Sequence, residues 1–217
     1  FKEAYKQYVD GGWQGMSAPV AYGGQGLPLS LGVVKSEMMA TANWVWNMYP
    51  GLSMGAMNTV YMHGTEEQKQ TYLIPMTEGR WTGTMCLTEP QAGSSLSDIT
   101  ASATPTENGY YKISGQKIFI SGGDHEYSDN FIHLLIGRID GAPEGTKGIS
   151  LFVVPKNRPN GDGTYAPNDV ITAGDFQKLG QRGYCTTHLV FGEKEECRGY
   201  LVGEANKELK YMFLMMN

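Results

Sequence analysis

Hydrophobic residues recur every three to four positions over residues 1–79, which is the period of an α-helix. Thr65-Glu66-Glu67-Gln68 forms a capping box, with a threonine at the cap and a glutamine three residues later. It predicts the start of a helix that ends near Pro75. The spacing predicts further helices over residues 1–9, 31–42 and 51–63.

From Trp81 the period changes to two, which is typical of β-strands. Asn108-Gly109 lies between two such segments and is a strong signal for a hairpin turn. Residues 157–168 are rich in Gly, Pro, Asn and Asp, so we expect an exposed excursion there. Strands are predicted over residues 82–87, 100–104, 110–114, 117–120, 131–136, 149–154, 175–178 and 187–191.

Helices followed by strands and then by a helix indicate an α+β fold in which the two kinds of element are segregated. We expect a helical N-terminal domain over residues 1–79, a middle β domain over 80–203, and the start of a second helical domain over 204–217. The last segment becomes helical from Ala205. Its apolar residues are Leu209, Met212, Phe213 and Met216.

Residues 82–95 begin as a strand and end as a loop of small residues. The strand breaks at Glu89-Pro90, because a residue that precedes proline is pushed out of the helical region. Gly93 allows a close approach to the backbone, and Ser94 and Ser95 offer hydroxyl groups beside backbone N–H groups. The loop is a candidate site for a phosphate or another polar group, and an ordinary strand-to-turn transition remains the alternative.

Two motifs together carry a family resemblance: Leu87-Thr88-Glu89-Pro90-Gln91-Ala92-Gly93-Ser94 and, later, Gly115-Gln116-Lys117-Ile118-Phe119-Ile120-Ser121-Gly122-Gly123. With them the chain resembles the acyl-CoA dehydrogenase family, whose members carry both motifs in this order. Supporting motifs lie upstream and downstream. They are Gly12-Trp13-Gln14-Gly15, Tyr22-Gly23-Gly24-Gln25-Gly26, His63-Gly64-Thr65-Glu66-Glu67-Gln68-Lys69, Gly148-Ile149-Ser150-Leu151-Phe152-Val153-Val154-Pro155 and Leu179-Gly180-Gln181-Arg182.

The resemblance covers nearly the whole chain. Residues 43–52 are most similar to the larger bacterial branch of the family, which includes enzymes that act on 3-methylmercaptopropionyl-CoA and on long-chain acyl-CoAs. It implies an α-helical N-terminal domain, a β-barrel-like middle domain and a C-terminal four-helix domain. The chain has no initiator Met and ends in an apolar run at Asn217. We therefore expect truncation at both ends, with the four-helix domain largely missing.

Composition and charge narrow the class of protein. With 41% hydrophobic and 18% charged residues, the sequence is typical of a globular protein. The formal net charge of −5 argues against a nucleic-acid partner, which requires a basic surface. The sequence also lacks an apolar run of the roughly 18 residues that a transmembrane helix needs, and its charged first residues do not resemble a signal peptide.

The cysteines and histidines predict no metal site. Cys86, Cys185 and Cys197 are too widely spaced for a zinc site, and their odd number does not fit a disulfide framework. We interpret them as reduced thiols, which indicates a bacterial cytoplasm or a mitochondrial matrix. The histidines show no metal-ligand spacing and are interpreted as structural.

The resemblance implies FAD as the cofactor, bound between the middle and C-terminal domains. Gly93 and Ser94 match the loop that meets the FAD pyrophosphate and the acyl-CoA, so Ser94 is also the candidate substrate contact. Phe119 matches an aromatic position beside the flavin ring, where most relatives have tryptophan. A plain core residue remains the alternative for Phe119. The other implied FAD contacts are Met85, Leu87, Thr88, Ile120 and Ser121.

Two residues depart from the family pattern. Ser95 stands where relatives carry aspartate, and Met85 stands where they carry tyrosine. Neither change removes a group that the chemistry requires.

The reaction that the resemblance implies is α,β-dehydrogenation of an acyl-CoA to the 2-enoyl-CoA, with electrons passed to an electron-transfer flavoprotein. A carboxylate removes the α-proton, and the family places this base in the C-terminal domain, beyond Asn217. We do not expect Glu89 to be the base, because it lies at a turn before Pro90. We therefore expect no catalytic residue in this chain, an inactive fragment, and a homodimeric or homotetrameric full-length enzyme of fatty acid metabolism.

Two alternatives stay open at this point. The same fold carries flavin acyl-CoA oxidases and monooxygenases, and a fold does not determine a chemistry. A non-enzymatic binding module with a β-sandwich core would also fit the alternation of the strands.

Overall fold

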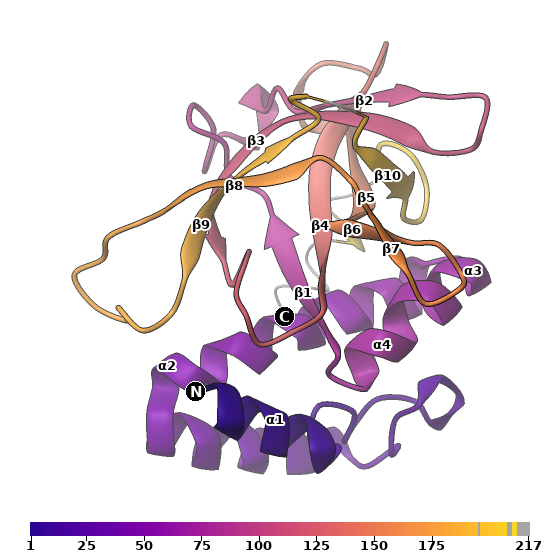
Figure 1. Cartoon of the computed structure of the whole chain (residues 1–217). Helices are drawn as coiled ribbons and strands as arrows, with labels where there is room; N and C mark the ends of the chain where they lie inside the picture. The colour runs from indigo at the N-terminus through magenta and orange to yellow at the C-terminus, as the bar shows by residue number, and fades with distance from the viewer. Residues whose placement is uncertain (195, 208–209, 212–217) are drawn as a thin grey trace.

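A computed structural model describes residues 1–194, 196–207 and 210–211. Figure 1 shows a curved, barrel-like sheet above a layer of helices, with the N-terminus in the helical layer. A helical N-terminal part followed by a β-barrel-like part is the architecture that the sequence predicts. In the described part of the chain, no helix is both long and apolar enough to cross a membrane.

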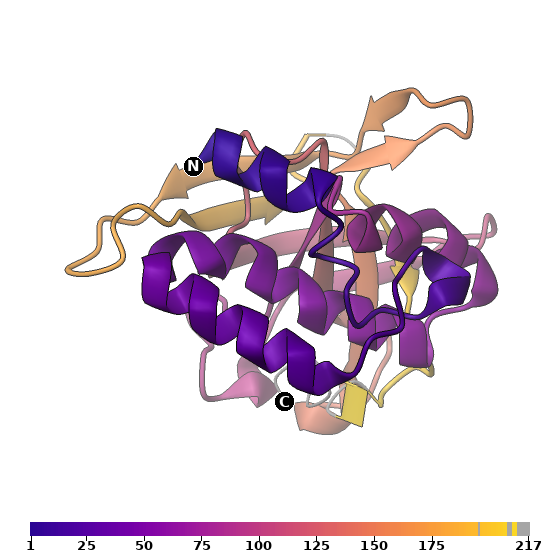
Figure 2. The ribbon, with the colours of Figure 1, turned by 90° about the horizontal axis from the view of Figure 1, so that it is seen from below.

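The helical layer consists of α1 (Lys2–Asp10), the short η1 (Val20–Tyr22) and the long α2 (Leu29–His63). Asn43 divides α2 into two helices, because its backbone is extended, with φ −162° and ψ 98°. The Asn43 side chain accepts a hydrogen bond from Trp46 N–H and so caps the second helix. Figure 2 shows the two halves side by side, with α1 beside them.

The second half of α2 begins earlier than predicted. Residues 44–50 are helical, and Pro50 lies inside the helix. The prediction of a helix start at residue 51 was wrong, because Val45, Trp46 and Tyr49 pack in one cluster with α1 and with the loops that precede β4 and β9, and this tertiary packing overrides local propensity. Tyr49 and Pro50 are both buried.

The predicted capping box is confirmed. Thr65 accepts a hydrogen bond from Gln68 N–H, and Thr65 N–H donates to the Gln68 side chain. The helix runs as α3 (Glu66–Gln68), a π-helical turn η2 (Lys69–Leu73) and α4 (Ile74–Thr77). It ends just before β1, so it delivers the chain directly to the sheet.

The strands of the large sheet are β1 (Trp81–Cys86), β2 (Ser102–Pro105), β3 (Tyr111–Ser121), β4 (Asn130–Ile139), β5 (Ile149–Pro155), β8 (Val170–Asp175), β9 (Thr186–Phe191) and β10 (Arg198–Leu201). Their order is β1-β4-β5-β10-β3-β9-β8. Because β2 pairs with both β3 and β4, the path from β4 through β5, β10 and β3 returns to β4 and closes a barrel. The hairpin predicted at Asn108-Gly109 joins β2 to β3, and Gly109 takes the positive φ of 79° that such a turn needs.

Alternating residues of the central strands face two different cores. Ile132 and Leu134 of β4 belong to the cluster that packs on α2, whereas Leu135 points into the barrel. Gly83 of β1 lies so close to α2 that an added Cβ would come within 2.4 Å of the Ala56 Cβ. The Gly83 N–H also donates to Ser53 Oγ, which holds β1 on the helix.

Several strand predictions need correction. The predicted strands 110–114 and 117–120 form one strand, β3, and β8 occupies residues 170–175 instead of 175–178. The excursion at 157–168 contains a hairpin of β6 (Asn157–Pro159) and β7 (Tyr165–Pro167), and β10 was missed. The limits of these strands depend on hydrogen bonding to a partner strand, and the local sequence does not show which segment that partner is.

Two further short helices flank the site, η3 (Leu96–Asp98) and η4 (Gly145–Gly148). The helix predicted from Ala205 begins later, because residues 205–206 form a turn, while Lys210 and Tyr211 are helical. Leu209, Met212, Phe213 and Met216 lie outside the described residues.

Candidate functional site

The site is built where β1 leaves the sheet and passes beside β3. A tight turn follows the strand, because Glu89 N–H donates to the Ala92 carbonyl and Ala92 N–H donates back to the Glu89 carbonyl. Ile118 N–H donates to the Thr88 carbonyl at 2.8 Å. The two sequence motifs therefore lie side by side, joined by backbone hydrogen bonding.

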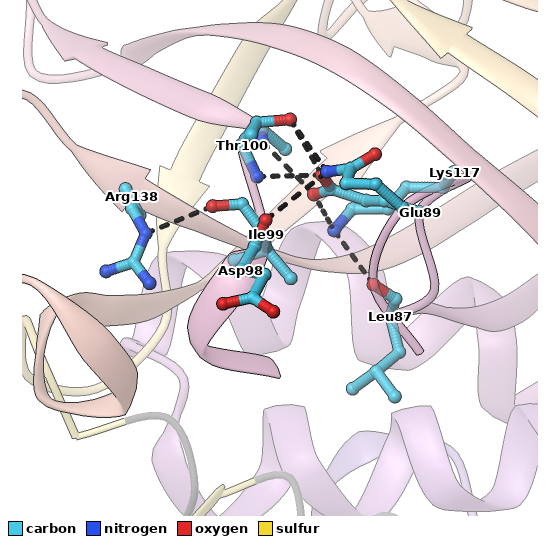
Figure 3. A network of polar contacts seen from close by, with 9 residues as sticks. Leu87, Glu89, Asp98, Ile99, Thr100, Lys117 and Arg138 are labelled. Atoms are coloured by element: carbon cyan, nitrogen blue, oxygen red, sulfur yellow. Dashed lines mark hydrogen bonds and ion pairs between the residues drawn. The ribbon is translucent and has the colours of Figure 1, made fainter. Parts of the chain in front are cut away.

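The Glu89 carboxylate is buried, with 2% of its side chain exposed, and pairs with the fully buried Lys117 at 2.8 Å. One carboxylate oxygen also accepts from Ala101 N–H, and the other accepts from the Thr100 N–H, the Thr100 hydroxyl and the Gln91 amide. Figure 3 shows the pair at the centre of this network. Burial acts to raise the pKa of Glu89, but Lys117 and the backbone donors outweigh it and lower the pKa, so the carboxylate is ionised.

Lys117 also donates a hydrogen bond from its Nζ to the Leu87 carbonyl, at 3.0 Å. Burial lowers the pKa of Lys117, and Glu89 opposes that shift. The ammonium group thus connects the end of β1, the turn at Glu89 and the middle of β3.

Arg138 holds the far end of the same loop. Its guanidinium donates to the carbonyls of Ser97 and Ile99, and also to those of Pro143 and Gly145. Figure 3 shows Arg138 beside Ile99, on the other side of Thr100 from Glu89. A buried carboxylate at one end and an arginine at the other therefore fix the ends of the loop that carries Gly93 and Ser94.

A bulge in β3 reverses the expected direction of its side chains. The register with β9 shifts between Lys117 and Ile120, and Phe119 has a positive φ of 58°. Lys117 and Ile120 both point inward, whereas the Phe119 side chain is 55% exposed. A regular strand would place Lys117 and Phe119 on the same face, so the bulge is what carries the aromatic ring to the surface.

Phe119 has an aromatic neighbour that sequence analysis missed. The ring centroid of Phe176, just after β8, lies 4.5 Å from that of Phe119. Phe176 N–H donates to the Thr186 carbonyl of β9, which anchors the loop. No sequence signal marks Phe176, because it lies in a loop whose position depends on the β8 and β9 pairing.

The outer surface of the two motifs offers unpaired polar groups. Among the described residues, nothing accepts a hydrogen bond from Thr88 N–H, and the exposed Ser94 and Ser95 hydroxyls also lack a partner. A Cβ added at Gly93 would meet only the Thr88 Cγ2, at 3.7 Å, which is an ordinary contact. Packing within the chain therefore does not require glycine at position 93, which leaves this backbone open to a ligand.

The remaining predicted contacts differ in exposure. Met85, Leu87, Thr88 and Ser121 are partly exposed, although Leu87 also packs against the core cluster that faces α2. Ile120 is 2% exposed and belongs to the barrel core, so it could contact a ligand only through its backbone. The glycines after Ser121 have a packing role, since a Cβ on Gly123 would come within 2.1 Å of Thr187 Oγ1.

The buried His133 and the partly buried His125 make structural contacts. Burial lowers the pKa of His133 to about 3 and that of His125 to about 4. His133 Nδ1 lies 2.7 Å from Thr84 Oγ1, and His125 packs among aromatic rings. The described residues contain no group of three side chains that could hold a metal ion.

Comparison with known proteins identifies the family. Residues 84–193 match the acyl-CoA dehydrogenase middle domain, and residues 1–80 match the acyl-CoA dehydrogenase N-terminal domain. The chain belongs to the acyl-CoA dehydrogenase family. The domain boundaries at 79/80 and 203/204 stay predictions.

Relatives within the acyl-CoA dehydrogenase family are considerably longer. The chain is 43% identical over 217 residues to 3-methylmercaptopropionyl-CoA dehydrogenase of Ruegeria pomeroyi, and it covers 36% of that relative. The structure of butyryl-CoA dehydrogenase from Megasphaera elsdenii superposes with a TM-score of 0.83 at 26% identity, over 100% of this chain and 54% of that one. An acyl-CoA dehydrogenase from Bacillus anthracis, complexed with FAD, gives a TM-score of 0.79 at 26% identity, over 98% of this chain and 34% of that one.

The surface fits a flavin cofactor of the kind that acyl-CoA dehydrogenases carry. The exposed Phe119 and the partly exposed Phe176 offer an aromatic face for a planar ring. The Thr88 N–H has no acceptor among the described residues, and the Gly93 loop has room for a polar chain. Sequence analysis missed Lys117 and Arg138 as organisers of this surface. A lysine directly before the apolar run Ile118–Ile120 was the available signal for the first, whereas the role of Arg138 depends on carbonyls from separate loops.

Proposed function

We propose that the full-length protein that carries this chain is an FAD-dependent acyl-CoA dehydrogenase, which converts an acyl-CoA thioester to the 2-enoyl-CoA. The observation that carries the proposal is the exposed Phe119, held at a φ of 58° by the β3 bulge directly beside the β1 loop. A bulky residue adopts such a backbone at a cost of about 1–3 kcal/mol, and such strain clusters at functional sites. Core packing does not explain it, because the side chain is 55% exposed.

The residues that would hold FAD come from both sequence motifs and from the end of β1. Leu87 and Thr88 would meet the pyrimidine edge of the flavin, while Gly93 and Ser94 would meet the pyrophosphate. Phe119 would pack on the ring, with Ser121 nearby. Met85 and the backbone of Ile120 complete the proposed contacts. When bound, FAD supplies the acceptor for the hydrogen that leaves the β-carbon as hydride.

The chain's own residues limit where the catalytic base lies. Glu89 is the acidic residue within the first motif, and its oxygens are already occupied by Lys117, Thr100, Ala101 and Gln91. A general base needs a free lone pair within hydrogen-bond reach of the α-proton. We therefore propose that the base is not Glu89 and lies outside residues 1–217, so that this chain alone does not turn over acyl-CoA.

The substrate and partners follow from the family. We propose that acyl-CoA lies along the Gly93 loop with Ser94 as a contact, and that an electron-transfer flavoprotein accepts the electrons. We further propose a homodimer or homotetramer that works in fatty acid metabolism, in the cytoplasm of a bacterium or in a mitochondrial matrix. Similarity to a 3-methylmercaptopropionyl-CoA dehydrogenase supports testing that thioester beside linear acyl-CoAs.

The test is purification of the full-length protein, followed by mass spectrometry of the released cofactor and titration with a panel of acyl-CoAs. We expect FAD, and bleaching of its visible absorbance by at least one thioester without oxygen consumption. FMN alone, or no flavin, would contradict the cofactor assignment. Rapid reoxidation of the reduced flavin by oxygen would instead indicate an oxidase or a monooxygenase.

A further inference from the structure

Lys117 holds the end of β1 from inside the protein. Its side chain is fully buried, and its Nζ donates to the Leu87 carbonyl at 3.0 Å and to the Glu89 carboxylate at 2.8 Å. Neither bond is available from solvent. The ammonium group is therefore part of the internal structure and does not itself reach a ligand on the outer surface.

The Leu87 hydrogen bond determines where the Thr88 N–H points. In a trans peptide the carbonyl of one residue and the N–H of the next lie in one plane and point in opposite directions. Since Lys117 draws the Leu87 carbonyl inward, the Thr88 N–H points outward. In the described residues this N–H has no acceptor, which leaves it free for a ligand atom.

Lys117 also begins the bulge that exposes the aromatic ring. The register shift follows Lys117 directly, and the next residue, Ile118, donates to the Thr88 carbonyl. The inward side chain of Lys117 and the outward ring of Phe119 are thus consequences of one backbone distortion. The same residue ties both motifs to a common position.

We infer that Lys117 is a positioning residue for the flavin, which orients the Leu87–Thr88 peptide so that the Thr88 N–H is presented to the cofactor. This inference rests on the proposed function, since it takes FAD as the ligand. The alternative is that Lys117 serves only as the counter-ion of the buried Glu89.

A pair of variants of the full-length protein separates the two roles. Glu89→Gln keeps Lys117 and its bond to Leu87, whereas Glu89→Gln combined with Lys117→Met removes the donor as well as both charges. Replacing a buried ion pair as a unit is tolerated far better than removing one partner, and methionine adapts to the space of the lysine chain. We therefore expect the double variant to melt at or above the temperature of Glu89→Gln, so a loss of FAD affinity in the double variant would not reflect unfolding.

The decisive measurements are FAD affinity and the spectrum of bound FAD. We expect the double variant to bind FAD about tenfold more weakly than Glu89→Gln, the factor for roughly one misaligned hydrogen bond, with a shifted visible absorption band. Equal affinity and identical spectra in the two variants would overturn the inference and leave Lys117 as a counter-ion. If the unaltered protein binds no FAD, the proposed function fails first, and the inference fails with it.

Hydrogen exchange provides a readout that does not depend on the variants folding. In the unaltered protein, the Thr88 amide should exchange rapidly without FAD and become protected when FAD is added. An amide that is protected without FAD, or that stays unprotected with FAD bound, would overturn the outward orientation.

Discussion

Glu89 and Ser94 lie in the same loop and have opposite environments. The Glu89 side chain is buried, ion-paired and saturated with hydrogen bonds, whereas Ser94 is exposed and its hydroxyl has no partner among the described residues. The same contrast separates Lys117 from Phe119 in β3, where one side chain is fully buried and the other is 55% exposed. In each segment one residue holds the backbone and another is presented by it.

The contrast shows how a loop can be both rigid and available. A loop without internal anchors would lose conformational entropy when a ligand binds. Here Glu89, Lys117 and Arg138 have already ordered the backbone. The exposed residues of the loop should therefore contribute little to the free energy of unfolding. We call the buried anchors Glu89 and Lys117 the inner side of the site, and the exposed Ser94 its outer side. Variants on the inner side should change stability, and variants on the outer side should change ligand binding.

The largest effect is expected on the inner side. Glu89→Ala leaves Lys117 as a buried charge without a counter-ion, and breaking a buried pair in this way costs about 3–5 kcal/mol. Urea unfolding of the apoprotein measures it. The matched outer variant, Ser94→Ala, should stay within about 0.5 kcal/mol of the unaltered protein. Comparable losses in both variants would remove the distinction between the two sides.

A second effect on stability depends on pH and arises at the buried His133. Burial lowers the pKa of His133 from 6.5 to about 3, so the unfolded chain takes up a proton in this window while the folded chain does not. Stability is then fully present above pH 6.5 and is lost as pH falls toward 3, by about 1.4 kcal/mol per pH unit for one proton. Denaturant titrations should show a pH slope smaller by about one proton in His133→Gln than in the unaltered protein. An unchanged slope in His133→Gln would contradict the assignment.

On the outer side, Ser94→Trp should weaken acyl-CoA binding by about tenfold, because a bulky ring fills the space beside Gly93, and one decade corresponds to about 1.4 kcal/mol. The midpoint of thermal unfolding should change little, since the side chain is exposed. Spectral titration of the FAD-loaded protein measures the affinity. Unchanged affinity with FAD still bound would place the substrate elsewhere.

Phe119 tests the strain at the boundary between the two sides. Glycine adopts a positive φ without the Cβ penalty, which is about 1–2 kcal/mol for other residues. Phe119→Gly should therefore be more stable than Phe119→Ala by about 1 kcal/mol, the reverse of the usual order inside a strand. Chemical unfolding of the two apoproteins measures this difference, and both variants should bind FAD more weakly. If alanine is the more stable, the backbone at 119 is not strained.

The smallest effect concerns catalysis at an inner residue. Glu89→Gln should keep most of the turnover per bound flavin in the full-length enzyme, because the carboxylate faces Lys117 and not the substrate surface. Steady-state rates normalised to flavin content measure it. A loss on the order of a thousandfold, with the fold and the FAD content unchanged, would identify Glu89 as the base.

The sequence by itself determined the order of the elements and predicted the place of the candidate site. Helical spacing before residue 79 and alternation after residue 81 are local properties, and so are the Thr65 capping box and the Asn108-Gly109 turn. The two motifs predicted the candidate surface through their resemblance to the acyl-CoA dehydrogenase family, while the break at Glu89-Pro90 and the permissive Gly93 marked the loop locally.

Tertiary structure decided which way the side chains of these motifs face. The sequence of residues 117–120 gives no sign of the bulge in β3, because the bulge arises where β3 pairs with β9. The burial of Lys117 likewise requires Glu89 and Leu87, which come from the segment that follows β1, as partners. A charge is buried at low cost only where it is paired and hydrogen-bonded. Its partners here come from segments that only the folded barrel brings together, so the sequence near Lys117 does not reveal them.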